Sequence, residues 1–186
     1  MKRKVLLVLF FVMTVFLSAE QFKGVLGFNL NDSKSTVESK AKNDYYHYGE
    51  ENPNFFRYRP KGDYYSKMYA TRPVYEIQLA FYEDKLVWIE VLLKKGAVGS
   101  SSLEEIIAGI NNKYEFEKDL SISTSSYTLY TNVDTGVTFN CEEATGMLDF
   151  HDIEIRFCYL DKFQLFLKWE KEYKSAQKQK SLNDSI

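Results

Sequence analysis

The sequence predicts an α+β fold, a mainly antiparallel sheet with two or three helices packed against one face. Three observations support this class. Residues 75–93 form two extended runs around the turn Glu83-Asp84-Lys85, which is the pattern of a β-hairpin. Residues 127–141 repeat that pattern around Asp134-Thr135-Gly136. The segment Ser102-Leu103-Glu104-Glu105 has the form of a capping box, which opens a helix.

The first nineteen residues have the features of a secretory signal sequence. Three basic residues at positions 2–4 precede an apolar run from Val5 to Leu17, and Ser18-Ala19 follows it. As a helix this run would span about 20 Å, less than the ~30 Å hydrocarbon core of a bilayer. We therefore expect residues 1–19 to be a cleaved signal peptide, with no stable membrane span afterwards. Residues 20–186 would form a single α+β domain with a charged C-terminal helix or tail, in a periplasmic or secreted protein.

Composition limits the partners of the mature chain. Loss of residues 1–19 removes three of the 24 basic residues and none of the 26 acidic ones, so the net charge becomes −5. This balance argues against nucleic acid and anionic membranes as partners, because both need clustered lysine and arginine. Aromatic residues make up 16% of the chain, which is ample apolar surface for a core.

The remaining elements follow in chain order. Residues 24–30 are predicted to form one short strand, and Asn31-Asp32-Ser33 caps a weakly amphipathic helix that ends near Asn43. Residues 45–75 contain all three prolines and ten aromatic residues, and we expect an irregular region of short strands and turns there. Beyond the first hairpin and the capped helix come the second hairpin and a strand over residues 153–160.

The C-terminal segment fits two structures. Residues 163–170 alternate as a strand would, but they also form a helical face that continues into the charged residues beyond Trp169. We favour a helix, because the alternation fails after Trp169. Similar short runs at 76–79 and 154–157, each followed by Asp-Lys, suggest two tandem helix-plus-hairpin units.

Two cysteines, Cys141 and Cys158, would meet an oxidising compartment after export. In both of their strands the apolar residues carry odd numbers, so direct pairing points Cys141 into the core and Cys158 away from it. Thiols on opposite faces cannot bond without a bulge. We therefore favour free thiols over a disulfide, with Cys141 protected and Cys158 accessible.

The N-terminal half resembles the small envelope proteins of the BamE type and related tandem-repeat inhibitor-like folds. The likeness rests on Val25-Leu26-Gly27, on Ser33 and Val37, and on the spaced apolar residues of 77–81 and 84–89. It covers roughly residues 24–92, and the chain lacks that family's lipobox cysteine. The resemblance implies an envelope binding or assembly module without catalysis, and it transfers no functional residue.

Two clusters carry possible chemistry. Asp134-Thr135-Gly136 copies the core triplet of aspartic proteases, but it occurs once and is explained by a glycine-closed hairpin turn. Asp149, His151 and Asp152 could offer ligands to a divalent metal, yet three ligands on one loop rarely reach one ion. We favour a solvated loop, no cofactor and no catalytic residues.

The aromatic segment from Tyr45 to Arg72 is the most informative feature for function. Its aromatic residues are interleaved with Arg57, Arg59, Lys61 and Arg72, and tyrosine with arginine is the composition of binding hot spots. Tyrosines on an exposed sheet can also pair across strands without binding anything, so both interpretations stay open. The candidate partner-binding residues are Tyr46, Arg57, Tyr58, Arg59 and Tyr65.

These observations lead to one functional hypothesis and one alternative. The hypothesis is an exported, non-enzymatic envelope module that binds a protein, a peptide or a glycan through residues 45–72. The alternative is an exported hydrolase with a divergent active site. A hydrolase needs a pocket with convergent polar groups, whereas an adaptor presents an open aromatic face.

Overall fold

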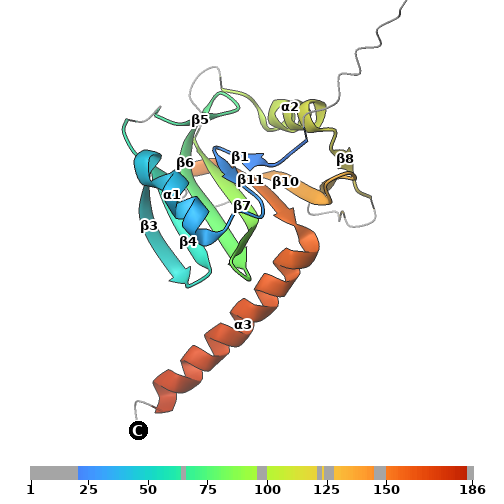
Figure 1. Cartoon of the computed structure of the whole chain (residues 1–186). Coiled ribbons are helices and arrows are strands. Elements are labelled where there is room, and N and C mark those ends of the chain that lie inside the picture. Colours follow the sequence, from blue (N-terminus) through green and yellow to red (C-terminus); the bar gives the residue numbers. More distant parts are fainter. Residues whose placement is uncertain are drawn as a thin grey trace, which may run out of the picture.

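The computed structural model describes residues 21–63, 66–95, 100–120, 123, 128–144 and 150–183. The predicted signal peptide, residues 1–19, lies outside the described residues. Within them the chain forms an antiparallel sheet whose strands run in the order β3-β4-β6-β7-β11-β10-β9-β8, with β5 paired to β6 at one side (Figure 1). Along the chain the strands are β3 Tyr45–Asn52, β4 Phe55–Pro60, β5 Met68–Tyr69, β6 Arg72–Tyr82, β7 Lys85–Lys94, β8 Glu117–Lys118, β9 Tyr130–Asn132, β10 Val137–Glu143 and β11 His151–Tyr159.

The α+β class is confirmed, and the order of elements shows an internal repeat. Helix α1 (Lys34–Asp44) precedes β3, β4, β6 and β7, with the two-residue β5 inserted before β6, and helix α2 (Leu103–Tyr114) precedes β8, β9, β10 and β11. The two sets of four strands meet where β7 pairs antiparallel with β11. By position β7 therefore corresponds to β11, whereas the similar sequence runs at 76–79 and 154–157 belong to β6 and β11.

One side of the sheet, here called the first face, carries the main core. Ile77, Leu79, Ile89 and Phe157 point to this side and are fully buried beneath α1 and α2. Both helices begin as predicted. The Ser33 hydroxyl accepts a hydrogen bond from the Thr36 N–H in α1, and Ser102 and Glu105 form a complete capping box in α2.

The N-terminal segment differs from its prediction. Instead of one strand over residues 24–30, it forms a tight hairpin of β1 (Gly24–Val25) and β2 (Phe28–Asn29). Leu26 and Gly27 occupy the turn with φ values of 54° and 90°, and two such residues are what a type I′ hairpin turn requires. The turn buries Val25 and Phe28 against the first face.

Residues 45–75 are more regular than predicted. Strand β3 continues directly from α1 and pairs with β4 over most of its length. The prolines do not interrupt this hairpin, because Pro53 lies between the two strands and Pro60 ends β4. Bulges at residues 48 and 51 of β3 absorb the irregularity that the composition indicated.

The C-terminal segment is a helix, α3 (Leu160–Asn183), which confirms the favoured prediction. It does not join α1 and α2, because its aromatic side chains pack on the opposite side of the sheet, here called the second face. Phe166 is buried there with Phe55, Trp88 and Cys158. Beyond this contact the helix extends away from the sheet (Figure 1). None of the helices among the described residues is long and apolar enough to cross a membrane.

Candidate binding face

The second face is organised in rows that cross the sheet. Strand register places Phe55, Ala80, Trp88, Cys158 and Thr138 side by side, and α3 covers this row. The next row away from α3 is polar and consists of Arg57, Gln78, Glu90, Arg156 and Asn140. The third row, farther still from α3, contains Glu76, Leu92, Glu154 and Glu142. One helix thus covers one end of the face and leaves a charged surface beside it.

Arg156 is the centre of that charged surface. Its guanidinium donates hydrogen bonds to the carboxylates of Glu90, Glu142 and Glu154. Burial raises the pKa of Glu90, and Arg156 opposes this shift. Burial alone would lower the pKa of Arg156, but the surrounding carboxylates, Glu90 first, raise it. Three carboxylates therefore share one permanently charged guanidinium.

A second network surrounds Glu76, whose side chain is almost fully buried. It accepts hydrogen bonds from Arg59 Nε at 3.1 Å and from Gln78 Nε2 at 3.0 Å. Arg57 approaches the same carboxylate at 3.9 Å and also pairs with Glu51. The two arginines of β4 are therefore held in place by a buried charge.

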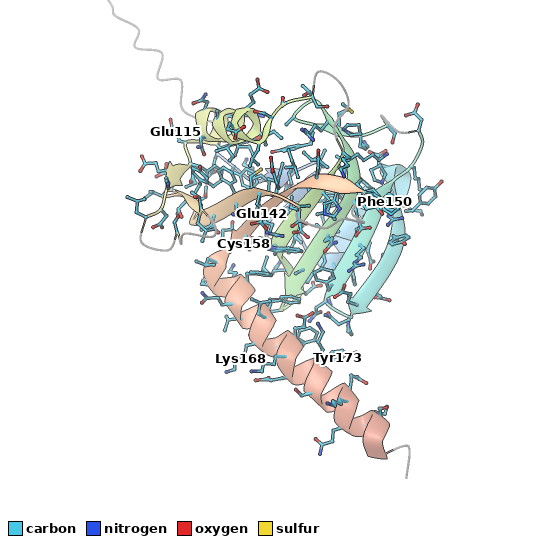
Figure 2. The ribbon with its side chains drawn as sticks, turned by 180° about the vertical axis from the view of Figure 1, so that it is seen from behind. Glu115, Glu142, Phe150, Cys158, Lys168 and Tyr173 are labelled. Atoms are coloured by element: carbon cyan, nitrogen blue, oxygen red, sulfur yellow. The ribbon has the colours of Figure 1, made fainter. Side chains whose placement is uncertain are left out.

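Beyond the third row lies a set of stacked side chains, four with rings and one guanidinium. It is here called the aromatic row and consists of Tyr48, Arg59, Tyr75, Phe150 and His151. The Arg59 guanidinium lies 3.5 Å from the centre of the Tyr48 ring and donates a 2.7 Å hydrogen bond to the Tyr75 hydroxyl. Tyr75 in turn stacks on Phe150 and on His151, with ring centres 5.9 and 6.0 Å apart. Tyr48 is 54% exposed and Phe150 is 73% exposed, so these two rings of the row face solvent, whereas Tyr75 and His151 are half-buried. Figure 2 labels Phe150 at this edge of the sheet.

The structure divides the predicted site residues. Tyr46 is 60% exposed and pairs in register with Arg59, so it belongs to the second face together with Arg57 and Arg59. Tyr58 does not, because strand alternation turns it to the first face, where it is 3% exposed and packs against Phe28. Its burial raises the pKa of its hydroxyl to about 12. Tyr65 lies outside the described residues.

Three members of the aromatic row were missed by sequence reasoning. Tyr75 is in phase with the apolar residues Ile77, Leu79 and Phe81, which predicts that it faces the core, but a bulge between Val74 and Glu76 turns it to the second face. Phe150 and His151 come from a part of the chain far from residues 45–72. A bulge and a long-range strand pairing leave no local sequence signal, so only the assembled sheet brings these rings together.

The described residues of the two clusters with possible chemistry make contacts within the fold. Gly136, with a φ of 66°, closes the β9–β10 hairpin through its N–H to the Asn132 carbonyl, which confirms the turn. Asp149 lies outside the described residues. His151 contacts Glu154 at 2.9 Å, whereas Asp152 pairs with Arg72 at 2.7 Å. The described residues contain no group of three or more side chains placed to hold a metal ion.

The cysteines lie on opposite faces, as strand phase predicted, and both are free thiols. Cys141 is buried on the first face, and burial raises its pKa to about 12. Cys158 is on the second face, 3.1 Å from the Thr138 hydroxyl. Its predicted accessibility is wrong, because α3 covers it and leaves it 8% exposed.

Comparison with known proteins gave no relative, since no protein-family model, no curated protein and no solved structure matches this chain. The resemblance to BamE-type proteins therefore stays an expectation. The class of protein rests on the fold alone, an α+β domain with one closed and one partly open sheet face.

Proposed function

We propose that the mature chain is an exported, non-enzymatic envelope module that binds a protein or peptide partner through the open part of its second face. The aromatic row is the observation that carries this proposal. A ring as exposed as Phe150 contributes little to a core, and aromatic residues beside arginine are the usual anchors of protein interfaces.

The centre of the aromatic row is held in place by several contacts, which favours binding. Arg59 donates a hydrogen bond to the buried Glu76 and stacks between Tyr48 and Tyr75. These two rings therefore lose little conformational entropy when a partner binds. The charged groups of this face bond mainly to one another. Such an arrangement supports a fixed platform better than an acid and a base aimed at a substrate.

Pull-down from an envelope extract with the tagged mature chain tests this proposal. The double variant Tyr48→Ala/Phe150→Ala should lose a partner that the wild type recovers, with its melting temperature almost unchanged. Tyr173→Ala is the matched control, because it removes a tyrosine from the part of α3 beyond the sheet (Figure 2). If the double variant stays folded and recovers every wild-type partner, the aromatic row is not the binding surface.

A further inference from the structure

A pocket of about 440 Å³ opens on the second face between the first turn of α3 and strands β10 and β11. This volume lies within the range of pockets that hold small ligands or single side chains, about 300 to 1,000 Å³. Its apolar wall includes Trp88, Leu129, Leu160 and Phe163. Its polar wall includes Asn140, Glu142 and Arg156, so it joins the charged surface described above.

The apolar wall is fixed before any ligand enters. The Trp88 and Phe163 rings are parallel within 3°, with centres 5.4 Å apart. Phe163 also stacks on Phe166, which is buried between α3 and the sheet. An apolar group that enters this pocket therefore meets a preformed apolar wall.

The polar wall favours a cation. Arg156 is engaged by three carboxylates and is poorly placed to bind a further anion. Glu142 is the most exposed of the three, at 39% for its side chain, and it lines the pocket. Because three carboxylates face one guanidinium, the local charge is negative and attracts a positive group.

We propose that this pocket binds a peptide segment in which an apolar residue is followed by arginine or lysine. The apolar side chain lies against Trp88 and Phe163, and the positive group pairs with Glu142. This inference rests on the proposed function, because it takes the occupant to be part of the same partner. His151 of the aromatic row and Cys158 beside the pocket lie near the two ends of β11, roughly 23 Å apart at about 3.3 Å per residue. An extended peptide of about seven residues would contact both sites.

Titration of the purified mature chain with two matched probes tests the pocket. Acetyl-leucyl-arginine amide carries the expected charge, and acetyl-leucyl-citrulline amide has almost the same shape without it. In a Trp169→Phe background Trp88 is the single tryptophan, so its fluorescence and its indole N–H resonance report on the pocket directly. The arginine probe should bind at least about fivefold more tightly than the citrulline probe, because a charge-assisted hydrogen bond is lost.

Two glutamate variants test whether Glu142 is the residue that binds the positive group of the arginine probe. Glu142→Gln should weaken binding of the arginine probe at least about fivefold and leave the citrulline probe unaffected. Glu143→Gln is the control, because it removes the same charge from the next residue, which strand alternation turns to the other face. Should Glu142→Gln fail to fold, the difference between the two probes on the wild type decides the question.

Three results would overturn the inference: equal affinity of the two probes, equal effects of the two glutamate variants, or phenethylamine binding as tightly as the arginine probe. The last result would assign the pocket to a free amine. These failures are separate from failure of the proposed function, which is tested by the aromatic-row variants in envelope extracts. If those variants lose their partner while neither probe binds, the pocket inference alone is wrong.

Discussion

The two faces of the sheet are built from the same strands and differ in what covers them. On the first face two helices and the β1–β2 hairpin cover a continuous apolar core. On the second face α3 alone covers one row, and the neighbouring rows hold buried carboxylates paired with arginines. Stability of this domain is therefore expected to reside on the first face, and ligand recognition on the second. Five predictions test this division.

The largest effect is expected from a truncation on the first face. Phe157 is fully buried and stacks on Phe22 with ring centres 4.5 Å apart. Phe157→Ala should lower the free energy of unfolding by about 3 to 5 kcal/mol, because it leaves a cavity that its neighbours cannot fill. Urea denaturation measures the loss. Phe163→Ala, on the second face, should cost less, and an equal cost would contradict the division.

Removal of a side chain beneath α3 should loosen the contact between this helix and the sheet without unfolding the rest of the domain. Phe166→Ala should loosen the helix and raise the alkylation rate of Cys158 more than about tenfold, because the buried ring holds α3 on the sheet. The rate at Cys141 should stay unchanged. Mass mapping after reaction with iodoacetamide measures both rates, and Leu167→Ala, a change at an exposed position of α3, is the control. Equal acceleration at both cysteines would mean that α3 is part of the global fold.

Arg156→Met should lower the free energy of unfolding by about 2 to 3 kcal/mol, because it leaves the carboxylate of Glu90 buried without its cation. Adding Glu90→Gln should restore part of this loss, since the amide carries no charge. A double-mutant cycle in urea measures the coupling. Strictly additive effects would show that the two side chains do not stabilise each other.

The pKa of Glu90 also predicts a pH dependence. Burial raises this pKa above its ordinary value of 4.5, so the folded chain binds a proton more tightly than the unfolded chain does. The contribution of Glu90 to stability is then most favourable below 4.5 and declines as pH rises through the raised pKa. The stability difference between wild type and Glu90→Gln should fall over that window. A difference that is constant with pH would contradict the shift.

The smallest effect is expected at the exposed end of the second face. Tyr46→Ala should change the free energy of unfolding by less than about 0.5 kcal/mol, because its ring contributes little to packing. Tyr58→Ala, a change of the same residue type on the first face, should cost about 3 to 5 kcal/mol. Thermal melts of the two variants compare them. Similar melting temperatures would show that the two tyrosines have equivalent surroundings.

Local patterns in the sequence predicted most of the elements. The alternation at residues 75–93 gave β6 and β7, and Ser102 with Glu105 gave the start of α2. The phase of the strands also placed Cys141 and Cys158 on opposite faces. These features depend on near neighbours along the chain, so their signals lie within short windows.

The candidate site was predicted only in part. Arg57 and Arg59 lie where a binding surface was expected, but Tyr58 does not, because composition alone ignores strand alternation. Tyr75 was displaced by a bulge, and Phe150 reaches it only because β11 pairs with β7 next to β6. The burial of Cys158 depends on which face α3 covers, and a helix with apolar residues on several sides does not specify that.

The junction of the two repeated halves has a consequence for how the chain folds. Strand β7 is mostly apolar and buried, and on one side it pairs with β11, which lies more than fifty residues later in the chain. Until residues 151–159 pair with it, β7 is an edge strand with unpaired backbone groups. Such an edge can recruit another copy of itself and start aggregation. A chain in which β6 and β7 have paired before β11 has joined them is therefore expected to be prone to aggregation.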